Sequence, residues 1–86
     1  MHESDLADRI LVTFREAVAE ILGHLPEFTP TTPIEDVGID SLDLIEVGMI
    51  MEDTYGVEMS DKDFEGVKVV GDVLNIFASM ARDAGG

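Results

Sequence analysis

Apolar side chains recur at helical spacing in three segments of the chain, and this pattern predicts three main helices. The first helix is expected from about Ser4 to Leu22, the second from about Ser41 to Tyr55, and the last from about Val70 to Arg82. Their apolar stripes consist of Leu6, Ile10, Phe14, Ala17 and Ile21; of Leu44, Val47, Met51 and Tyr55; and of Val70, Val73, Leu74 and Phe77. No segment alternates between apolar and polar residues as a half-buried strand would. The pattern therefore predicts an all-α fold.

Residues that favour helix ends support these boundaries. Ser4 is expected to be the N-cap of the first helix, and Gly23 is expected to end it. Asp40 is expected to be the N-cap of the second helix, which places Ser41 at its first helical position. Gly56 is expected to end this second helix. The last four residues, Asp-Ala-Gly-Gly, are expected to be frayed.

Two further segments complete the expected fold. The capping sequence Ser-Asp-Lys-Asp at 60–63 predicts a short third helix that ends near Glu65, before Gly66. A long loop, about 23–40, joins the first two main helices and contains three prolines, which disfavour regular helix. The apolar loop residues expected to pin it to the core are Phe28, Ile34, Val37 and Ile39. The prediction is a small four-helix bundle, with three main helices plus one short third helix, in a single domain of residues 1–86.

The composition disfavours an enzyme and a dedicated metal site. A chain of 86 residues leaves little room for a deep catalytic cleft. It has no cysteine, and neither His2 nor His24 has a clear spacing to a nucleophile or a metal partner. The acids from Asp36 to Glu46 do not follow the EF-hand pattern, because Gly38 stands where a ligand is required. We therefore expect no catalytic residue and no bound metal.

The charge is strongly acidic and unevenly distributed. The chain carries 19 Asp and Glu against 5 Lys and Arg, a net charge of -14, and no Lys or Arg occurs from Glu16 through Asp61. This charge would repel nucleic acid and anionic membranes, and no apolar stretch is long enough to span a bilayer. It favours protein partners with basic patches, although a solvated acidic surface explains it equally well. The absence of cysteine and of a secretory signal predicts a cytoplasmic protein, which we expect to be a monomer.

The second predicted helix has an apolar stripe in addition to its core positions. Leu42, Ile45 and Met49 form this stripe, which is offset around the helix. Ser41 opens the same helix after an unusually long loop, and loops of this length are often functional. A serine at a helix start is most often a cap. The alternative is a modified serine, because the helix dipole favours a phosphate at an exposed first turn.

The sequence around Ser41 resembles the attachment motif of acyl carrier proteins. The residues Gly38-Ile39-Asp40-Ser41-Leu42-Asp43 match this motif, in which Asp-Ser-Leu follows a glycine two residues upstream. The other segments that resemble the family are 33–38, 44–47, 49–55, 59–61 and 69–77. The clear resemblance covers about Thr32 to Ala78, and the first helix fits by its order and length.

The resemblance implies a carrier rather than an enzyme. Ser41 would receive 4'-phosphopantetheine from coenzyme A through a separate Mg-dependent phosphopantetheinyl transferase, whose substrate is this chain. The arm would hold acyl intermediates as thioesters for fatty acid or polyketide-type biosynthesis. The other partners would be acyl-loading, condensing and modifying enzymes with basic docking patches. The residues that the resemblance assigns to partner docking are Asp40, Leu42, Asp43, Ile45, Glu46, Met49, Glu52 and Asp53.

Other functions remain open at this point. A peptidyl or aminoacyl carrier shares the serine and the arm, but its motif usually has a different residue, often His, where Asp40 stands. An acidic helical interaction module without a cofactor would leave Ser41 a purely structural role. Within the acyl carriers, the first helix lacks the basic residues that open many fatty-acid carriers, which favours a specialised pathway.

Four residues depart from the expected pattern. Gly48 lies inside the second helix, where glycine costs about 1 kcal/mol relative to alanine, and a close contact with another helix would explain it. Lys68 and Val69 stand where the family often has a polar cap, and Gly71 weakens the same helix start. We therefore expect the last helix to begin loosely.

Overall fold

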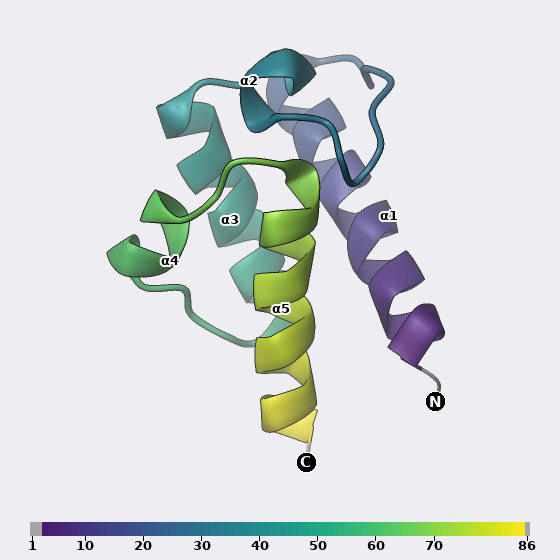
Figure 1. Ribbon diagram of the computed structural model, residues 1–86, viewed down its shortest axis with the longest axis vertical. Coiled ribbons are helices and arrows are strands. Elements are labelled where there is room, and N and C mark those ends of the chain that lie inside the picture. The colour runs from purple at the N-terminus through teal and green to yellow at the C-terminus, as the bar shows by residue number, and fades with distance from the viewer. Residues whose placement is uncertain (1–2, 86) are drawn as a thin grey trace.

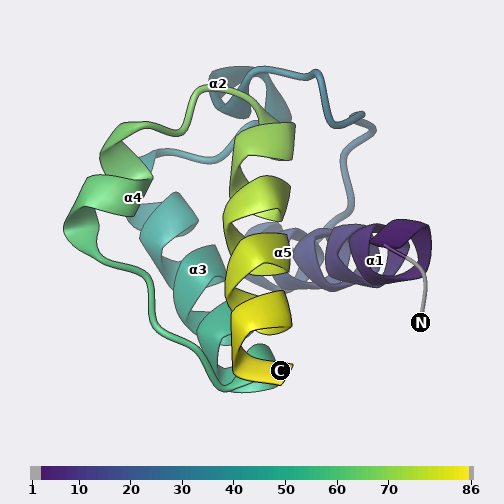
Figure 2. The same ribbon diagram turned by 60° about the horizontal axis from the view of Figure 1, so that its bottom comes forward.

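The computed structural model describes residues 3–85 and contains five helices within them (Figure 1). The helices are α1 (Glu3–Leu22), α2 (Ile34–Val37), α3 (Ser41–Tyr55), α4 (Asp61–Glu65) and α5 (Val70–Gly85). The long helix α1 packs against both α3 and α5, whereas α4 lies beside α3 on the side away from α1 (Figure 2). No strand occurs in the described part of the chain. The predicted all-α bundle with its long loop is confirmed.

Most of the predicted helix ends are confirmed. Helix α3 has the predicted bounds, and Gly56 ends it in the left-handed conformation, with φ of 66°. The prediction for Ser4 is wrong, because α1 already includes it; acidic residues in a first turn favour the helix and let it begin earlier. The prediction of a frayed tail is also wrong as far as Gly85. Helix α5 continues to this residue, and several good helix formers precede the tail. Gly86 lies outside the described residues.

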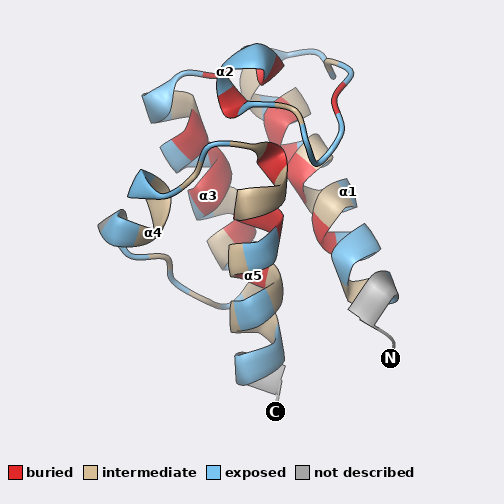
Figure 3. Cartoon of the chain, in the orientation of Figure 1, coloured by how far each residue is buried: buried red, intermediate tan, exposed pale blue. Residues whose placement is uncertain are grey.

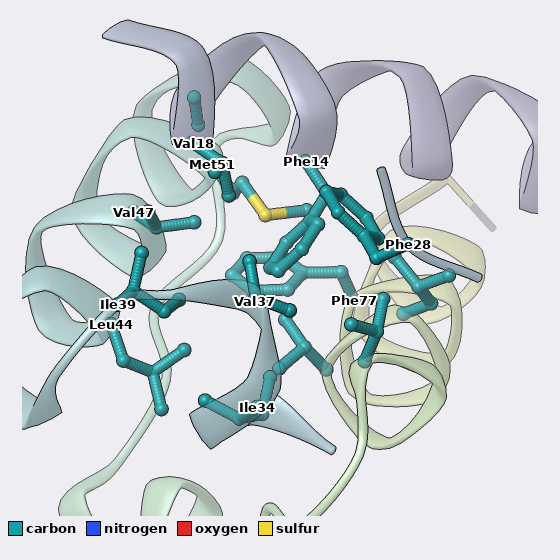
Figure 4. Packing of buried hydrophobic residues seen from close by; sticks show 14 of the residues in the cluster. Phe14, Val18, Phe28, Ile34, Val37, Ile39, Leu44, Val47, Met51 and Phe77 are labelled. Carbon is teal, nitrogen blue, oxygen red and sulfur yellow. The ribbon is translucent and has the colours of Figure 1, made fainter. Parts of the chain in front are cut away.

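The core is an apolar cluster to which all three long helices and the loop contribute (Figures 3 and 4). Phe14 and Phe77 are the largest side chains that are fully buried. The ring of Phe14 meets that of Phe28 edge to face, with centroids 5.6 Å apart, a favoured geometry for aromatic pairs. The predicted loop anchors are all buried: Phe28, Ile34, Val37 and Ile39. The loop before Ser41 is therefore held firmly against the bundle.

The one-turn helix α2 lies within this loop and was not predicted. Pro33 directly precedes it as the N-cap, with a non-helical backbone of φ -58° and ψ 142°. Ile34 and Val37 are three positions apart, so one helical turn brings both onto the face that meets the core. Gly38 then ends the turn in the left-handed conformation. Tertiary burial, rather than local propensity, accounts for α2.

Gly48 is explained by the close approach of α4 to α3. A Cβ atom at this position would lie 2.7 Å from Cζ of Phe64 and 2.9 Å from its Cε1. The missing side chain at Gly48 therefore leaves the space that the Phe64 ring fills. This is the close helix contact that the sequence led us to expect.

Replacing Gly48 with Ala should lower the free energy of unfolding by about 1 kcal/mol, because overpacking against Phe64 outweighs the better helix propensity of alanine. In a Phe64→Ala background the clash is absent, so the same replacement should raise stability by about 1 kcal/mol. Urea denaturation of the four proteins in this double-mutant cycle measures both values. A stabilising effect in both backgrounds would show that the contact does not constrain Gly48.

The start of α5 is fixed by hydrogen bonds, so the prediction of a loose start is wrong. The carboxylate of Asp72 accepts hydrogen bonds from the backbone N–H groups of Lys68 (2.9 Å) and Val69 (3.1 Å). These bonds hold the pKa of the Asp72 carboxyl below its ordinary value. The next two N–H groups donate to loop carbonyls: Val70 to Thr32 (2.9 Å) and Gly71 to Pro30 (2.7 Å). Two of these four acceptors, the carbonyls of Thr32 and Pro30, belong to a loop that is distant in the sequence, and the residues before α5 give no sign of them.

Candidate attachment site and docking surface

A complete capping box forms the N-terminus of α3. The Asp40 carboxylate accepts a hydrogen bond from the backbone N–H of Asp43 at 2.8 Å, and the Asp43 carboxylate accepts one from the N–H of Asp40 at 3.3 Å. The predicted N-cap role of Asp40 is confirmed. This reciprocal pair satisfies two of the backbone donors that a helix start leaves open. The helix is therefore capped without any help from Ser41.

Ser41 lies at the first position of α3 and is exposed. No hydrogen bond joins its hydroxyl to any group among the residues that the structure describes. The hydroxyl is thus accessible and is not engaged in capping, which removes the simplest structural explanation for this serine.

A phosphodiester fits the surroundings of Ser41. Ser41 is exposed at the positive end of a 15-residue helix, where a negative group is favoured. The two neighbouring carboxylates, those of Asp40 and Asp43, are already bound to backbone N–H groups. Attachment at Ser41 would therefore require neither unfolding of the first turn nor removal of a buried group.

The second apolar stripe of α3 is exposed rather than buried. Leu42 is 71% exposed, Ile45 44% and Met49 58%. The core positions of the same helix point the other way and are coloured red on the α3 ribbon in Figure 3. The residues at these core positions are Leu44, Val47 and Met51. The three exposed apolar side chains begin directly beside Ser41, so the attachment candidate and an apolar contact surface occupy one end of α3.

The four acids that the sequence assigned to docking on this helix differ in their availability. Glu46 and Asp53 are exposed and lie on the same outward face as Leu42 and Met49, judged by helical spacing. Asp43 is part of the capping box. The carboxylate of Glu52 accepts a hydrogen bond from the backbone N–H of Met59 at 2.9 Å and so ties α3 to the segment before α4. The sequence does not reveal this role of Glu52, because its partner is a backbone group seven positions away.

The described residues contain no metal-binding cluster and no candidate membrane span. No group of three or more His, Asp or Glu side chains within them could hold a metal ion. Among the helices of residues 3–85, none is both long and apolar enough to cross a membrane. His24 is exposed just after α1, and His2 lies outside the described residues.

Comparison with known proteins agrees with this geometry. Residues 12–77 match the family described as "Phosphopantetheine attachment site". The meromycolate extension acyl carrier protein of Mycolicibacterium smegmatis is 38% identical over 78 residues, which cover 88% of this chain and 79% of that protein. The protein of the same name from Mycobacterium leprae is 33% identical over 78 residues, which cover 88% of this chain and 68% of that protein.

The three-dimensional comparison gives the same fold. The crystal structure of an acyl carrier protein from Thermotoga maritima superposes with a TM-score of 0.87, covering 96% of this chain and 99% of that one, at 21% identity. The chain belongs to the phosphopantetheine-binding family of acyl carrier proteins. Members of this family bear a covalently attached 4'-phosphopantetheine, and they are non-catalytic carriers that work with biosynthetic enzymes.

Proposed function

We propose that this chain carries acyl groups on a 4'-phosphopantetheine attached to Ser41. The observation that supports this most directly is the exposed Ser41 hydroxyl, which caps nothing although it opens α3. A phosphopantetheinyl transferase would use this hydroxyl as the acceptor, which makes the chain its substrate. When attached, the arm supplies a terminal thiol that holds an acyl group as a thioester.

The chain's own residues present the attachment point and the contact surface. Asp40 and Asp43 keep the first turn of α3 folded around Ser41. Leu42, Ile45 and Met49 offer apolar area of the kind found at the centre of protein interfaces. Glu46 and Asp53 border it with negative charge, which steers a basic partner and favours fast encounter.

The cargo that we propose is a growing fatty acyl chain. The relatives from Mycobacterium leprae and Mycolicibacterium smegmatis are named for meromycolate extension. These names support a role for this chain in fatty-acid-type synthesis. The opening of the first helix favoured a specialised pathway instead. Loading tests with fatty acyl and with polyketide-type starter groups would separate these two classes of cargo.

The test is intact-mass analysis of the apo protein after incubation with coenzyme A, Mg²⁺ and a promiscuous phosphopantetheinyl transferase. We expect a mass gain of one phosphopantetheine group, and we expect peptide fragmentation to locate it on Ser41. No gain, or a gain on another residue, would refute the proposal. Amino-acid-activating enzymes that load the holo protein would instead identify a peptidyl carrier.

A further inference from the structure

Two segments, residues 30–34 at the start of α2 and residues 68–71 at the start of α5, are joined by backbone hydrogen bonds. We call this contact the loop pairing. Figures 1 and 2 both show the segment before α5 running beside α2. The three bonds run from the N–H of Ile34 to the carbonyl of Lys68 (2.9 Å), from Val70 to Thr32 (2.9 Å) and from Gly71 to Pro30 (2.7 Å). Pro33 and Val69 form an isolated antiparallel bridge in the same place.

Asp72 fixes the backbone of residues 68 and 69, which form one side of the loop pairing. A single carboxylate oxygen, Oδ2, accepts the N–H groups of both Lys68 and Val69. These two bonds fix the segment whose Lys68 carbonyl receives the N–H of Ile34. Val69, the residue before α5, has no side-chain acceptor of its own, so the helix start depends on Asp72 and on the loop carbonyls.

Gly71 allows the two segments to approach. A Cβ atom at this position would lie 3.0 Å from the carbonyl oxygen of Pro30, which is tighter than an ordinary contact. The neighbouring atom belongs to the backbone and cannot rotate away. Any larger residue would therefore push against the loop pairing from the side of α5.

The loop pairing is connected to Ser41 by a short and tightly held stretch of chain. Ile34 takes part in the pairing and also begins α2. The residues that follow are held by the burial of Val37 and Ile39. The stretch ends at the N-cap Asp40. Six residues thus separate Ile34 from Ser41, and they have few ways to absorb a shift of α2.

We propose that Asp72 is a positioning residue for Ser41, which it places for the transferase through the loop pairing and α2. This inference rests on the proposed attachment at Ser41. Without Asp72, the segment bearing Ser41 samples arrangements that the transferase does not accept. Only the molecules with Ser41 in the accepted arrangement bind the transferase, so the apparent affinity equals the intrinsic affinity multiplied by their fraction. The rate of the bound complex stays the same.

The experiment measures the transferase kinetics of apo wild type, Asp72→Ala, Asp72→Asn and Asp83→Ala, with the carrier as the varied substrate. Asp83→Ala is the matched control, because it removes one exposed carboxylate from the same helix, α5. All proteins are compared at a temperature where circular dichroism shows them folded. Hydrogen exchange of the Ile34 and Val70 amides reports the loop pairing directly.

We expect Asp72→Ala to raise KM by about three- to tenfold with kcat unchanged within about twofold. It should also speed exchange of both amides. Asp72→Asn keeps a carbonyl oxygen that can accept both bonds, so its KM should lie between wild type and Asp72→Ala. Asp83→Ala should match wild type. If Asp72→Ala does not fold, Gly71→Ala disturbs the same pairing from Pro30 and should give the same rise in KM.

Two results would overturn the proposal. Unchanged KM in a folded variant whose amides exchange faster would show that Ser41 is placed without the loop pairing. Unchanged exchange in Asp72→Ala would show that the carboxylate does not hold the pairing. Failure of the proposed function looks different, because the wild type itself then gains no mass; the positioning role falls with it.

Discussion

Ser41→Ala should abolish the mass gain from coenzyme A and a phosphopantetheinyl transferase completely, because it removes the acceptor oxygen. The change should leave the free energy of unfolding within about 0.5 kcal/mol of wild type, as expected for an exposed side chain without a specific contact. The Ser41 hydroxyl caps nothing in the structure, since Asp40 and Asp43 satisfy the helix start. Intact-mass analysis and urea denaturation measure the two effects independently.

Ser60→Ala is the matched control for this loss. Ser60 is also exposed and also stands at a helix start, where it is the N-cap of α4. This variant should gain the same mass as wild type. Modification of Ser41→Ala to the same extent as wild type would exclude Ser41 as the attachment point. A large loss of stability in Ser41→Ala would indicate instead that the serine is mainly structural.

Reversing the charge of Glu46 and Asp53 together to lysine should reduce kcat/KM for the transferase by about 10- to 100-fold at low ionic strength. Both carboxylates are exposed beside the apolar stripe of α3, and electrostatic steering of this kind accelerates association by about 10 to 1,000-fold. The defect should shrink as salt is added, because exposed charges are screened. Titration of the rate against ionic strength measures this dependence.

The control for charge reversal is Glu20→Lys with Glu27→Lys. These acids are exposed but lie at the end of α1 and in the following loop, so the variant has the same net charge with α3 unchanged. We expect a much smaller change in kcat/KM for it. Equal defects in the two double variants would mean that total charge, and not the outward face of α3, attracts the partner. Glu52 is unsuitable for this test, because its carboxylate holds the Met59 amide.

The parts of the fold that were predicted correctly depend on neighbouring residues in the sequence. Helix α3 has an aspartate cap before it and a glycine after it, and both signals act within a few positions. Helix α2 was missed because its only strong determinant is the burial of Ile34 and Val37. The cap of α5 was missed for a similar reason, since two of its acceptors belong to Pro30 and Thr32. Such bonds exist only once the loop has packed against the bundle.

The same distinction applies to the candidate site. Ser41 and its apolar neighbours are recognisable from a local motif and from helical spacing, and the structure exposes both. The sequence does not reveal in this way which acids of α3 are free at the surface and which are bound to the backbone. Helical spacing places Glu52 close to the outward face, but its carboxylate is used by a backbone amide from the next loop. Which acids remain exposed and which one binds the backbone therefore depends on how the segment before α4 lies against α3.

The contact between Gly48 and Phe64 limits how this carrier can be re-engineered. A designer who wants to change its choice of partner enzymes would graft a foreign second helix in place of α3. Any graft with a side chain at position 48 would meet the Phe64 ring at less than contact distance. The Phe64 ring would then have to leave its place between α3 and α4. The segment before α4 is also tied to α3, by the hydrogen bond from the Met59 amide to Glu52. Because α3 and α4 fit each other through this contact, a chimera should replace both helices and the loop between them, residues 41–65, as one unit.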